Sequence, residues 1–378
     1  MRADCSTTPS RIRVALVAPT HQILGGHSVQ AERMLEGWAQ GADVEAWLVP
    51  INPTPPGPFA RLLKLKYIRT LVTQLCYWPL LLRQLRRADV VHVFSASRTG
   101  FLLSTVPALV VASLLRKPIV LNYHSGDAPE HLAGSRLARV LLRHAVDVIV
   151  VPSRFLFDVF RRFGLKTTVV FNSIDAARYN YGRRLPLRPQ LLSTRNFEPL
   201  YNIACTLRAF VRVQKHHPEA TLTLIGAGSQ DKVLRELALT LGLKNVTFLG
   251  RVHPREMARH YAAADIYIQT PSIDNMPLSV LEAFASGLPV VSTRVGGVPT
   301  ILTDQQHGLM ANDNDDAGIA DCVLQLLDDP ERARTLAAHA RDTLRAYDWA
   351  PVRERWLAVY RSVLAPASKR PMVRVETA

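Results

Sequence analysis

Hydrophobic and polar positions alternate between two patterns along this chain. Short, continuously apolar runs recur, and stretches in which apolar residues return every three or four positions separate most of them. Continuous short runs are typical of parallel strands buried on both faces, and the intervening spacing is typical of helices. In the first half the predicted strands are Arg11–Ala18, Val44–Val49, Val90–Phe94, Ile119–Tyr123, Val148–Val151 and Thr168–Val170. Six such strands predict a doubly wound α/β domain.

The second half repeats this pattern, so a second α/β domain is expected. Its predicted strands are Leu191–Thr194, Leu222–Ile225, Val246–Leu249, Ile266–Gln269 and one that begins at Val290. Predicted helices run from about Asn202 to His216 and Gln230 to Leu241, through Tyr261, from about Asp316 and Pro330, and over Pro351–Leu364. A chain of 378 residues also exceeds what one ordinary core accommodates. The segment Phe171–Pro189, with Gly182, Pro186 and Pro189, is predicted to be the linker.

The sequence indicates no membrane span or targeting signal. Its longest apolar run, Phe101–Leu115, contains Ser104, Thr105, Pro107 and Ser113, and is shorter than the roughly 18–20 residues that a spanning helix needs. We expect a buried helix there. Met1–Arg11 lacks the apolar core of a signal peptide, and the four cysteines lack paired or metal-ligand spacing. These features predict a cytoplasmic protein.

The formal charge of +15 is concentrated in the first half of the chain. Residues 1–190 contain 25 Lys and Arg against 11 Asp and Glu, whereas residues 191–378 contain 21 against 20. Segment 59–87 has no acidic residue and interleaves arginines and lysines with leucines and aromatic residues. This pattern predicts peripheral contact with an anionic membrane, at its inner face in a cytoplasmic protein, or with an anionic acceptor. A solvated helix face is the alternative. No recognition helix or base-stacking module indicates nucleic-acid binding.

Residues Ser272–Gly297 carry the strongest candidate chemistry. Pro277 suits a first helical turn and Gly287 suits the position after a helix end, which predicts a short helix between a loop and a strand. Asp274 and Glu282 are eight positions apart, a little over two helical turns, so one ligand could contact both. A helix N-terminus suits an anion such as a diphosphate, and acids suit sugar hydroxyls. The alternative is that Asp274 caps the helix and Glu282 is an exposed helical acid.

Other candidate residues follow predicted strands. Gly25 and Gly26 lie in the loop after the first strand, and His124 follows Ile119–Tyr123 directly. Parallel sheets bind ligands at such strand ends, although a tight turn and a structural histidine are the alternatives. Asp313-Asn314-Asp315 matches an Asp-x-Asp metal motif but precedes a predicted helix, so we expect it to act as a helix cap and expect no metal.

The stretch from Ser272 to Gly297 resembles the signature of family 4 of the retaining glycosyltransferases: two acids eight positions apart, then small-Gly-x-Pro-Val-Val and Gly-Gly. The resemblance covers roughly residues 11–364. It implies the GT-B arrangement, two doubly wound Rossmann-like domains that face a central cleft. The implied boundaries are 1–178 for the acceptor-binding domain, to which a crossing helix at 349–365 returns, 179–348 for the donor-binding domain, and 366–378 for a loose tail.

The resemblance also implies roles for individual residues. The Glu282 position contacts the nucleotide ribose, Asp274 and His124 lie beside the donor sugar, and Arg195 binds the donor diphosphate. The implied catalytic residues are therefore His124 and Asp274. The implied donor-binding residues are Gly25, Gly26, Arg195, Gly226, Gly228, Asn275, Met276, Pro277, Leu278, Glu282 and Arg294.

This sequence departs from the family pattern near Arg195. The family usually has a second phosphate-binding cation, a Lys inside Glu-Lys-Gly, where this chain has Glu198-Pro199-Leu200-Tyr201-Asn202. Arg294 is the candidate to compensate, and a surface arginine is the alternative. Asp274 also stands where the family has Glu, beside Asn275-Met276-Pro277 instead of Gly-Phe-Pro.

Together these features predict a retaining, metal-independent hexosyltransferase without a cofactor. It would move a sugar from a UDP-, GDP- or ADP-sugar to a glycan, lipid-linked or small-molecule acceptor, as in polysaccharide biosynthesis. A nucleotide-sugar epimerase of the same architecture is one alternative, although the first domain offers few candidate acids, chiefly Asp127 and Glu130. A catalytically reduced sugar-nucleotide-binding protein is the other, because the second phosphate cation is missing.

Overall fold

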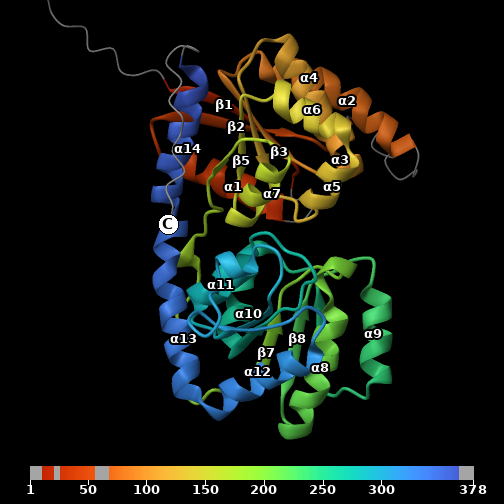
Figure 1. The fold of residues 1–378 in the computed structure, drawn as a ribbon, viewed down its shortest axis with the longest axis vertical. Coiled ribbons are helices and arrows are strands. Elements are labelled where there is room, and N and C mark those ends of the chain that lie inside the picture. Colours follow the sequence, from red (N-terminus) through yellow and green to blue (C-terminus); the bar gives the residue numbers. More distant parts are fainter. Residues whose placement is uncertain (1–10, 21–25, 56–67, 366–378) are drawn as a thin grey trace, which may run out of the picture. The chain divides into compact units, whose positions relative to one another are not determined.

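The computed structural model describes residues 11–20, 26–55 and 68–365. The chain divides into two compact units (Figure 1). Unit 1 comprises residues 1–173 and 352–378, and unit 2 comprises residues 174–351. The corresponding boundaries expected from the sequence are 178/179 and 348/349. Gly25, residues 59–67 of the basic segment and the tail at 366–378 lie outside the described residues.

Unit 1 contains a six-stranded parallel sheet in the order β2-β1-β3-β4-β5-β6. Its strands are β1 (Ile12–Ala18), β2 (Val44–Pro50), β3 (Val90–Ser95), β4 (Ile119–Tyr123), β5 (Val148–Val151) and β6 (Thr167–Val169). All six predicted strands are therefore confirmed. Residues of β1, β3 and β4 are almost entirely buried, as continuous apolar runs in a sheet covered on both faces should be.

The helices of unit 1 cover its sheet. They are α1 (Gly26–Ala39), α2 (Ile68–Leu85), the short α3 (Arg98–Gly100), a π-helical turn η2 (Phe101–Thr105), α4 (Val106–Leu114), α5 (Ala128–Gly134), α6 (Arg136–His144), α7 (Arg154–Arg162) and α14 (Trp349–Leu364). Helix α14 comes from the end of the chain, and its Trp356 and Tyr360 pack against His92 in β3. Residues 352–364 of this helix therefore belong to unit 1.

The segment Phe101–Leu115 is helical, but it is not fully buried as predicted, because one of its faces is exposed. Phe101, Ala108 and Leu109 are buried, but Leu102 and Leu114 are 49% and 72% exposed. The segment is apolar all round, and the sheet covers only one side of it. None of the described helices is long and apolar enough to span a bilayer.

Unit 2 contains a second parallel six-stranded sheet, in the order β12-β11-β10-β7-β8-β9. Its strands are β7 (Gln190–Ser193), β8 (Thr221–Ile225), β9 (Val246–Gly250), β10 (Ile266–Ile268), β11 (Val290–Thr293) and β12 (Leu309–Ala311). The edge strand β12 was not predicted. It has three residues, too few for a periodic pattern, and it pairs with β11.

The helices of unit 2 are α8 (Ile203–His216), α9 (Asp231–Thr240), α10 (Met257–Ala263), α11 (Leu278–Ser286), α12 (Asp316–Asp328) and α13 (Pro330–Asp342), with 3₁₀ turns η3 (Ala176–Arg178), η4 (Pro199–Tyr201), η5 (Pro254–Glu256), η6 (Val298–Thr300) and η7 (Thr343–Tyr347). Asp315 is the N-cap of α12, and its carboxylate accepts from the Gly318 backbone N–H at 2.8 Å. Asn314 accepts from Arg208 at 2.8 Å. The Asp-x-Asp motif therefore serves helix capping, as expected.

Candidate functional site

The main candidate site lies on unit 2, at the carboxyl ends of its central strands. β7 is the first strand of this sheet and lies between β10 and β8, so the strand order reverses there. Ligands of open parallel sheets bind at such a switch point. Arg195 follows β7, Gly226 follows β8, and the loop after β10 leads through Asp274 to the start of α11.

Arg195 lies at the centre of this site. Its guanidinium is buried, forms an ion pair with Asp274 and donates to the Ser279 hydroxyl at 3.1 Å. The Tyr201 ring lies 4.1 Å from the guanidinium carbon. Burial opposes the charged form, but Asp274 and the neighbouring tyrosines together more than offset it, so the pKa of Arg195 is raised. Three groups therefore fix a permanent positive charge in one orientation.

One donor of Arg195 is unused. Its Nε is buried and has no hydrogen-bond partner among the described residues. Buried N–H groups are nearly always paired in folded proteins. An unpaired guanidinium nitrogen at a strand end is therefore a ready donor for a ligand oxygen.

Asp274 does not cap a helix. The N-cap of α11 is Pro277, which is one residue before the helix, and no side chain caps this end. The Asp274 carboxylate accepts instead from the Asn275 backbone N–H at 2.8 Å and from Arg195. Burial raises the pKa of Asp274, while Arg195 and the Asn275 N–H oppose this shift. The helix-cap alternative for Asp274 is thus excluded.

Glu282 lies on the same network of contacts. It is half-buried on α11, and its carboxylate accepts from the Tyr261 hydroxyl at 3.0 Å. That hydroxyl also lies 2.7 Å from the Thr194 hydroxyl and 3.3 Å from the Ser279 backbone oxygen. Because Ser279 also contacts Arg195, both predicted acids belong to one connected set of side chains around the start of α11. Glu282 is not an isolated surface acid.

The candidate glycines hold backbone segments against one another. A Cβ on Gly297 would lie 1.8 Å from the Asn275 oxygen, and one on Gly296, at φ +52°, would lie 2.1 Å from the Asp274 oxygen. The Gly297 N–H donates to the Asp274 carbonyl at 2.8 Å. Gly-Gly was expected to let backbone approach a ligand. In the structure it lets the 296–297 turn approach the Asp274 loop, which fixes that loop.

Gly226 and Gly228 have the same function on the other side of Arg195. A Cβ on Gly226 would lie 2.1 Å from the Arg195 carbonyl oxygen, and one on Gly228 would lie 2.3 Å from the Phe197 oxygen. These glycines are therefore required for the chain after β8 to pack on the chain after β7. Gly226 and Gly228 therefore have a packing function in the site, whether or not they also contact a ligand.

The remaining predicted donor residues divide into two groups. Asn275, Met276 and Pro277 are buried in the loop before α11, and Leu278 is the first, half-buried residue of that helix. Arg294 is 46% exposed, forms an ion pair with Asp304 at 2.6 Å, and its backbone N–H donates to Ala311. Arg294 is thus engaged by an acid next to the edge strand, and its role as a second phosphate cation stays a prediction.

Unit 1 carries a separate cluster of histidines. His124 follows β4, and its ring lies 5.2 Å from the ring of His27 and 5.5 Å from that of Phe94. Burial and the neighbouring His27 and His92 rings hold the pKa of His124 well below its usual value. His124 is therefore neutral near pH 7, with one ring nitrogen able to donate and the other to accept.

His27 was missed by the sequence analysis, although it directly follows Gly25-Gly26. Burial lowers its pKa to about 4, so it is also neutral. Gly26 is exposed at the start of α1, and a Cβ there would meet no atom within 4 Å. His92 is fully buried, its Nδ1 lies 2.8 Å from the Tyr360 hydroxyl, and burial lowers its pKa to about 3. It is a packed residue.

Within the described residues, no group of three or more His, Cys, Asp or Glu side chains is arranged to hold a metal ion. Asp127, an acid near His124, accepts from Ser125 at 2.6 Å, Ser97 at 3.1 Å and Arg98 at 2.8 Å. Burial opposes ionisation of Asp127, but these hydrogen bonds hold its pKa below the usual value. It is a structural carboxylate that orders the loop after β4.

Comparison with known proteins agrees with this architecture. The family model of glycosyltransferase family 4 matches residues 24–178, and that of the glycosyl transferases group 1 matches residues 185–343. Glycogen synthase of Mycobacterium tuberculosis is 28% identical over 76% of this chain and 73% of its own length. D-inositol 3-phosphate glycosyltransferase of Nocardia farcinica is 27% identical over 94% of this chain and 90% of its own length.

Solved structures share the fold. The HepE protein of Anabaena in complex with UDP-glucose superposes with a TM-score of 0.76 at 18% identity, over 93% of this chain and 100% of that one. Sucrose-phosphate synthase of Thermosynechococcus elongatus gives a TM-score of 0.73 at 19% identity, with 93% and 99% covered. Two parallel six-stranded sheets with this similarity confirm the GT-B fold expected from the sequence. The chain belongs to the group 1 glycosyltransferases of family 4.

Proposed function

We propose that this glycosyltransferase transfers a hexosyl unit from a nucleoside diphosphate sugar to a hydroxyl acceptor with retention of anomeric configuration. Arg195 is the observation that carries this proposal: it is a buried, fixed cation with an unused Nε at the switch point of the second sheet. HepE, the Anabaena protein of the same fold, was crystallised with UDP-glucose. A diphosphate bound to this chain would contact Arg195 at the carboxyl end of β7.

The chemistry needed from the protein is stabilisation of the departing diphosphate. A donor placed where charge develops is worth more in a dry site than in water. Arg195 supplies a charged donor, and the first N–H groups of α11 supply the positive end of a helix. Asp274, held against Arg195, would accept from a hydroxyl of the transferred sugar, and Glu282 would accept from the ribose.

On unit 1 we assign His124 to the donor sugar. Because His124 is neutral, it can donate to a sugar hydroxyl or to the carbonyl of an N-acetyl group without adding charge beside the leaving group. The acceptor would bind to this unit.

The test is incubation with UDP-, GDP- and ADP-sugars and a panel of hydroxyl acceptors, with the product anomer read by NMR. Retaining transfer gives a product with the donor's anomeric configuration. An inverted product would refute the proposed stereochemistry. An epimerase would convert the donor without an acceptor, and a binding protein would shift the thermal midpoint with no turnover.

We expect transfer to survive chelation, because Arg195 and the start of α11 already offer positive partners to the diphosphate. The rate in excess EDTA should match the rate without EDTA. An enzyme that EDTA inactivates and that Mn²⁺ or Mg²⁺ restores would contradict this, and Asp313 and Asp315 would then be the first residues to substitute.

We also propose that unit 1 contacts an anionic membrane through α2. Ile68, Leu71, Leu75, Trp78 and Leu82 are exposed and recur every three or four residues along this helix, while Tyr77, Leu81 and Leu85 face the core. Arg69, Arg83, Arg86 and Arg87 flank the exposed stripe, and no acid occurs between residues 68 and 88. An apolar stripe with arginines beside it suits the lipid headgroup boundary.

The adjoining turn of unit 1 extends this surface. Leu102 and Leu103 are exposed there, and the Gln74 side chain donates to the Leu103 carbonyl at 2.8 Å. The turn therefore lies beside α2, and its leucines enlarge the apolar area that lipid would cover.

Replacing Leu71, Leu75 and Trp78 together with Ser should abolish co-flotation with anionic vesicles, because each large apolar side chain contributes about 1.5–3 kcal/mol when buried. The folded core should be intact, since these side chains are exposed. The matched control replaces the exposed Val233 and Leu239 of α9 with Ser and should float as wild type. Equal flotation of the α2 variant and wild type would contradict membrane contact through α2.

A further inference from the structure

Unit 2 contains a pocket at the opposite end of α11 from Arg195. It has a volume of about 310 Å³. Its lining includes Gly287, the residue that follows α11, and Pro289, which precedes β11. The pocket is therefore at the amino ends of the strands, whereas Arg195 and Asp274 are at the carboxyl ends. The lining residues are Tyr181, Gly182, Arg183, Arg184, Leu187, Gly287, Pro289, Ala333, Arg334, Thr335, Ala337 and Ala338.

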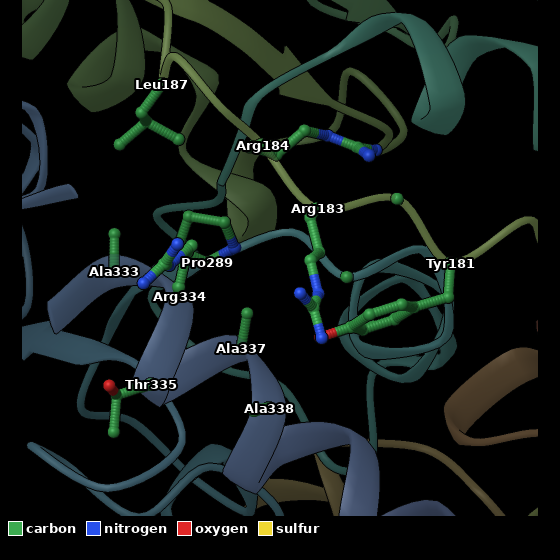
Figure 2. A pocket seen from close by; sticks show the side chains of 12 residues that line it. Tyr181, Arg183, Arg184, Leu187, Pro289, Ala333, Arg334, Thr335, Ala337 and Ala338 are labelled. Carbon is green, nitrogen blue, oxygen red and sulfur yellow. The ribbon is translucent and has the colours of Figure 1, made fainter. Parts of the chain in front are cut away.

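The pocket is basic with a small apolar floor. Three of its twelve described lining residues are arginines, and none of the twelve is Asp or Glu. Ala333 and Ala337 of α13 are buried beneath it. Figure 2 shows the side chains of Arg183 and Arg334 on opposite sides of the space, with Ala337 between them. This arrangement leaves room for a ligand between two guanidinium groups.

The three arginines differ in how they are engaged. Arg184 donates to the backbone oxygens of Ala264 and Tyr261 at 2.9 and 3.1 Å, so it is a structural residue. Arg334 forms an ion pair with Glu331 one turn earlier on α13, and Glu331 is 72% exposed. Arg183 has no hydrogen bond or ion pair with any residue in the described ranges. Two of the three charges are therefore available to a ligand.

No buried acid pairs with Arg183 or Arg334 among the described residues. Asp265, the nearest buried acid, pairs with Arg188 at 2.8 Å and lies 3.8 Å from Arg184. The last carbonyls of α11 accept backbone bonds: Ala283 from Leu288, Phe284 from Gly287, and Ser286 from Gly182. The carbonyl end of the helix is thus occupied by the protein itself, and the arginines remain the dominant charge at the pocket.

We propose that this pocket binds a small phosphorylated molecule. Arg183 and Arg334 would bind the phosphate, and Ala333 and Ala337 of α13 would contact the carbon atoms of the ligand. Guanidinium groups bind phosphate through charged, directional hydrogen bonds. The volume suits a phosphate monoester of a few carbons. The site is separate from the proposed donor site and does not depend on it.

The test is calorimetric titration of the full chain with inorganic phosphate and with glycerol 3-phosphate, with glycerol as the uncharged control. We expect glycerol 3-phosphate to bind and glycerol not to bind. Arg183→Gln with Arg334→Gln should raise its Kd at least about tenfold, because each substitution removes a charged donor. Arg183 is exposed and Arg334 is half-buried, and ion pairs near the surface such as Arg334–Glu331 contribute little to folding.

Two further variants locate the binding. Arg212→Gln, at an exposed arginine paired with Asp321, should bind as wild type and controls for the loss of one surface arginine. Arg195→Lys should also bind as wild type. Binding lost in the Arg195 variant but kept in the Arg183 and Arg334 variant would place the phosphate in the donor site and overturn the proposal, as would no binding of either phosphate. Tighter binding of inorganic phosphate than of glycerol 3-phosphate would identify the free ion as the ligand.

Discussion

Replacing Arg195 with Met, together with Asp274→Asn, should reduce kcat/KM for transfer by about 100-fold or more. A charged hydrogen bond contributes about 1.5–3 kcal/mol, and 2.7 kcal/mol is a factor of about 100. The double substitution is needed because Arg195→Met alone leaves the Asp274 carboxylate buried and unpaired, at a cost of about 3–5 kcal/mol in folding free energy. The measurement is transfer kinetics alongside thermal unfolding.

The matched control removes an ion pair of the same chemistry at the surface of unit 2. Arg212 and Asp321 are joined at 2.9 Å and are both exposed. Arg212→Met with Asp321→Asn should leave kcat/KM near the wild-type value. If the Arg195 and Asp274 pair were structural alone, its double variant would lose thermal stability and keep its activity, and the diphosphate assignment would fail.

The fold was largely predictable because its central strands are buried on both faces. Continuous apolar runs such as Ile119–Tyr123 and Val148–Val151 became strands with the same bounds. The three-residue β12 was missed because its position depends on pairing with β11 and not on its own pattern. The exposed face of α4 was missed because an apolar run does not reveal how much of it the sheet will cover.

The residues of the site were predictable individually, but their contacts were not. Arg195 and Asp274 are 79 positions apart, and each was assigned to a different part of the donor. Only the fold reveals that they form an ion pair, with Tyr201 over the guanidinium. Tyr201 was noted only for replacing part of a Lys-containing motif. In the structure it is a direct neighbour of Arg195 and favours the cation through its ring.

The backbones of Gly296 and Gly297 pack closely against the loop that contains Asp274. Gly296 and Gly297 exclude any Cβ because the Asp274 and Asn275 carbonyls occupy that space. The loop is therefore held against the turn after β11, and it carries an acid one methylene shorter than the family's Glu. The short side chain still reaches Arg195. A longer acid in this fixed loop would have to displace the guanidinium or turn away from it.

This geometry gives the final prediction. Asp274→Ala should lower kcat by at least about tenfold, because it removes the proposed contact to the transferred sugar, which would strengthen in the transition state. Nucleotide affinity should not fall below that of wild type, since Glu282 and its partner Tyr261 are untouched. Asp274→Glu should not improve on wild type, because the backbone around residue 274 is fixed by the glycine pair. The measurements are kcat for transfer and Kd for the nucleoside diphosphate.

Asp274→Asn separates the two functions of this carboxylate. The amide oxygen can still accept from the Asn275 N–H, so the loop should keep its shape, but the ion pair with Arg195 loses its negative partner. An Arg195 freed from that charge should bind the diphosphate more tightly while the sugar loses its acceptor. We therefore expect a lower Kd for the nucleoside diphosphate and a lower kcat in the same variant. Wild-type kcat in both Asp274→Ala and Asp274→Asn would show that Asp274 only orients Arg195, and that another group holds the sugar.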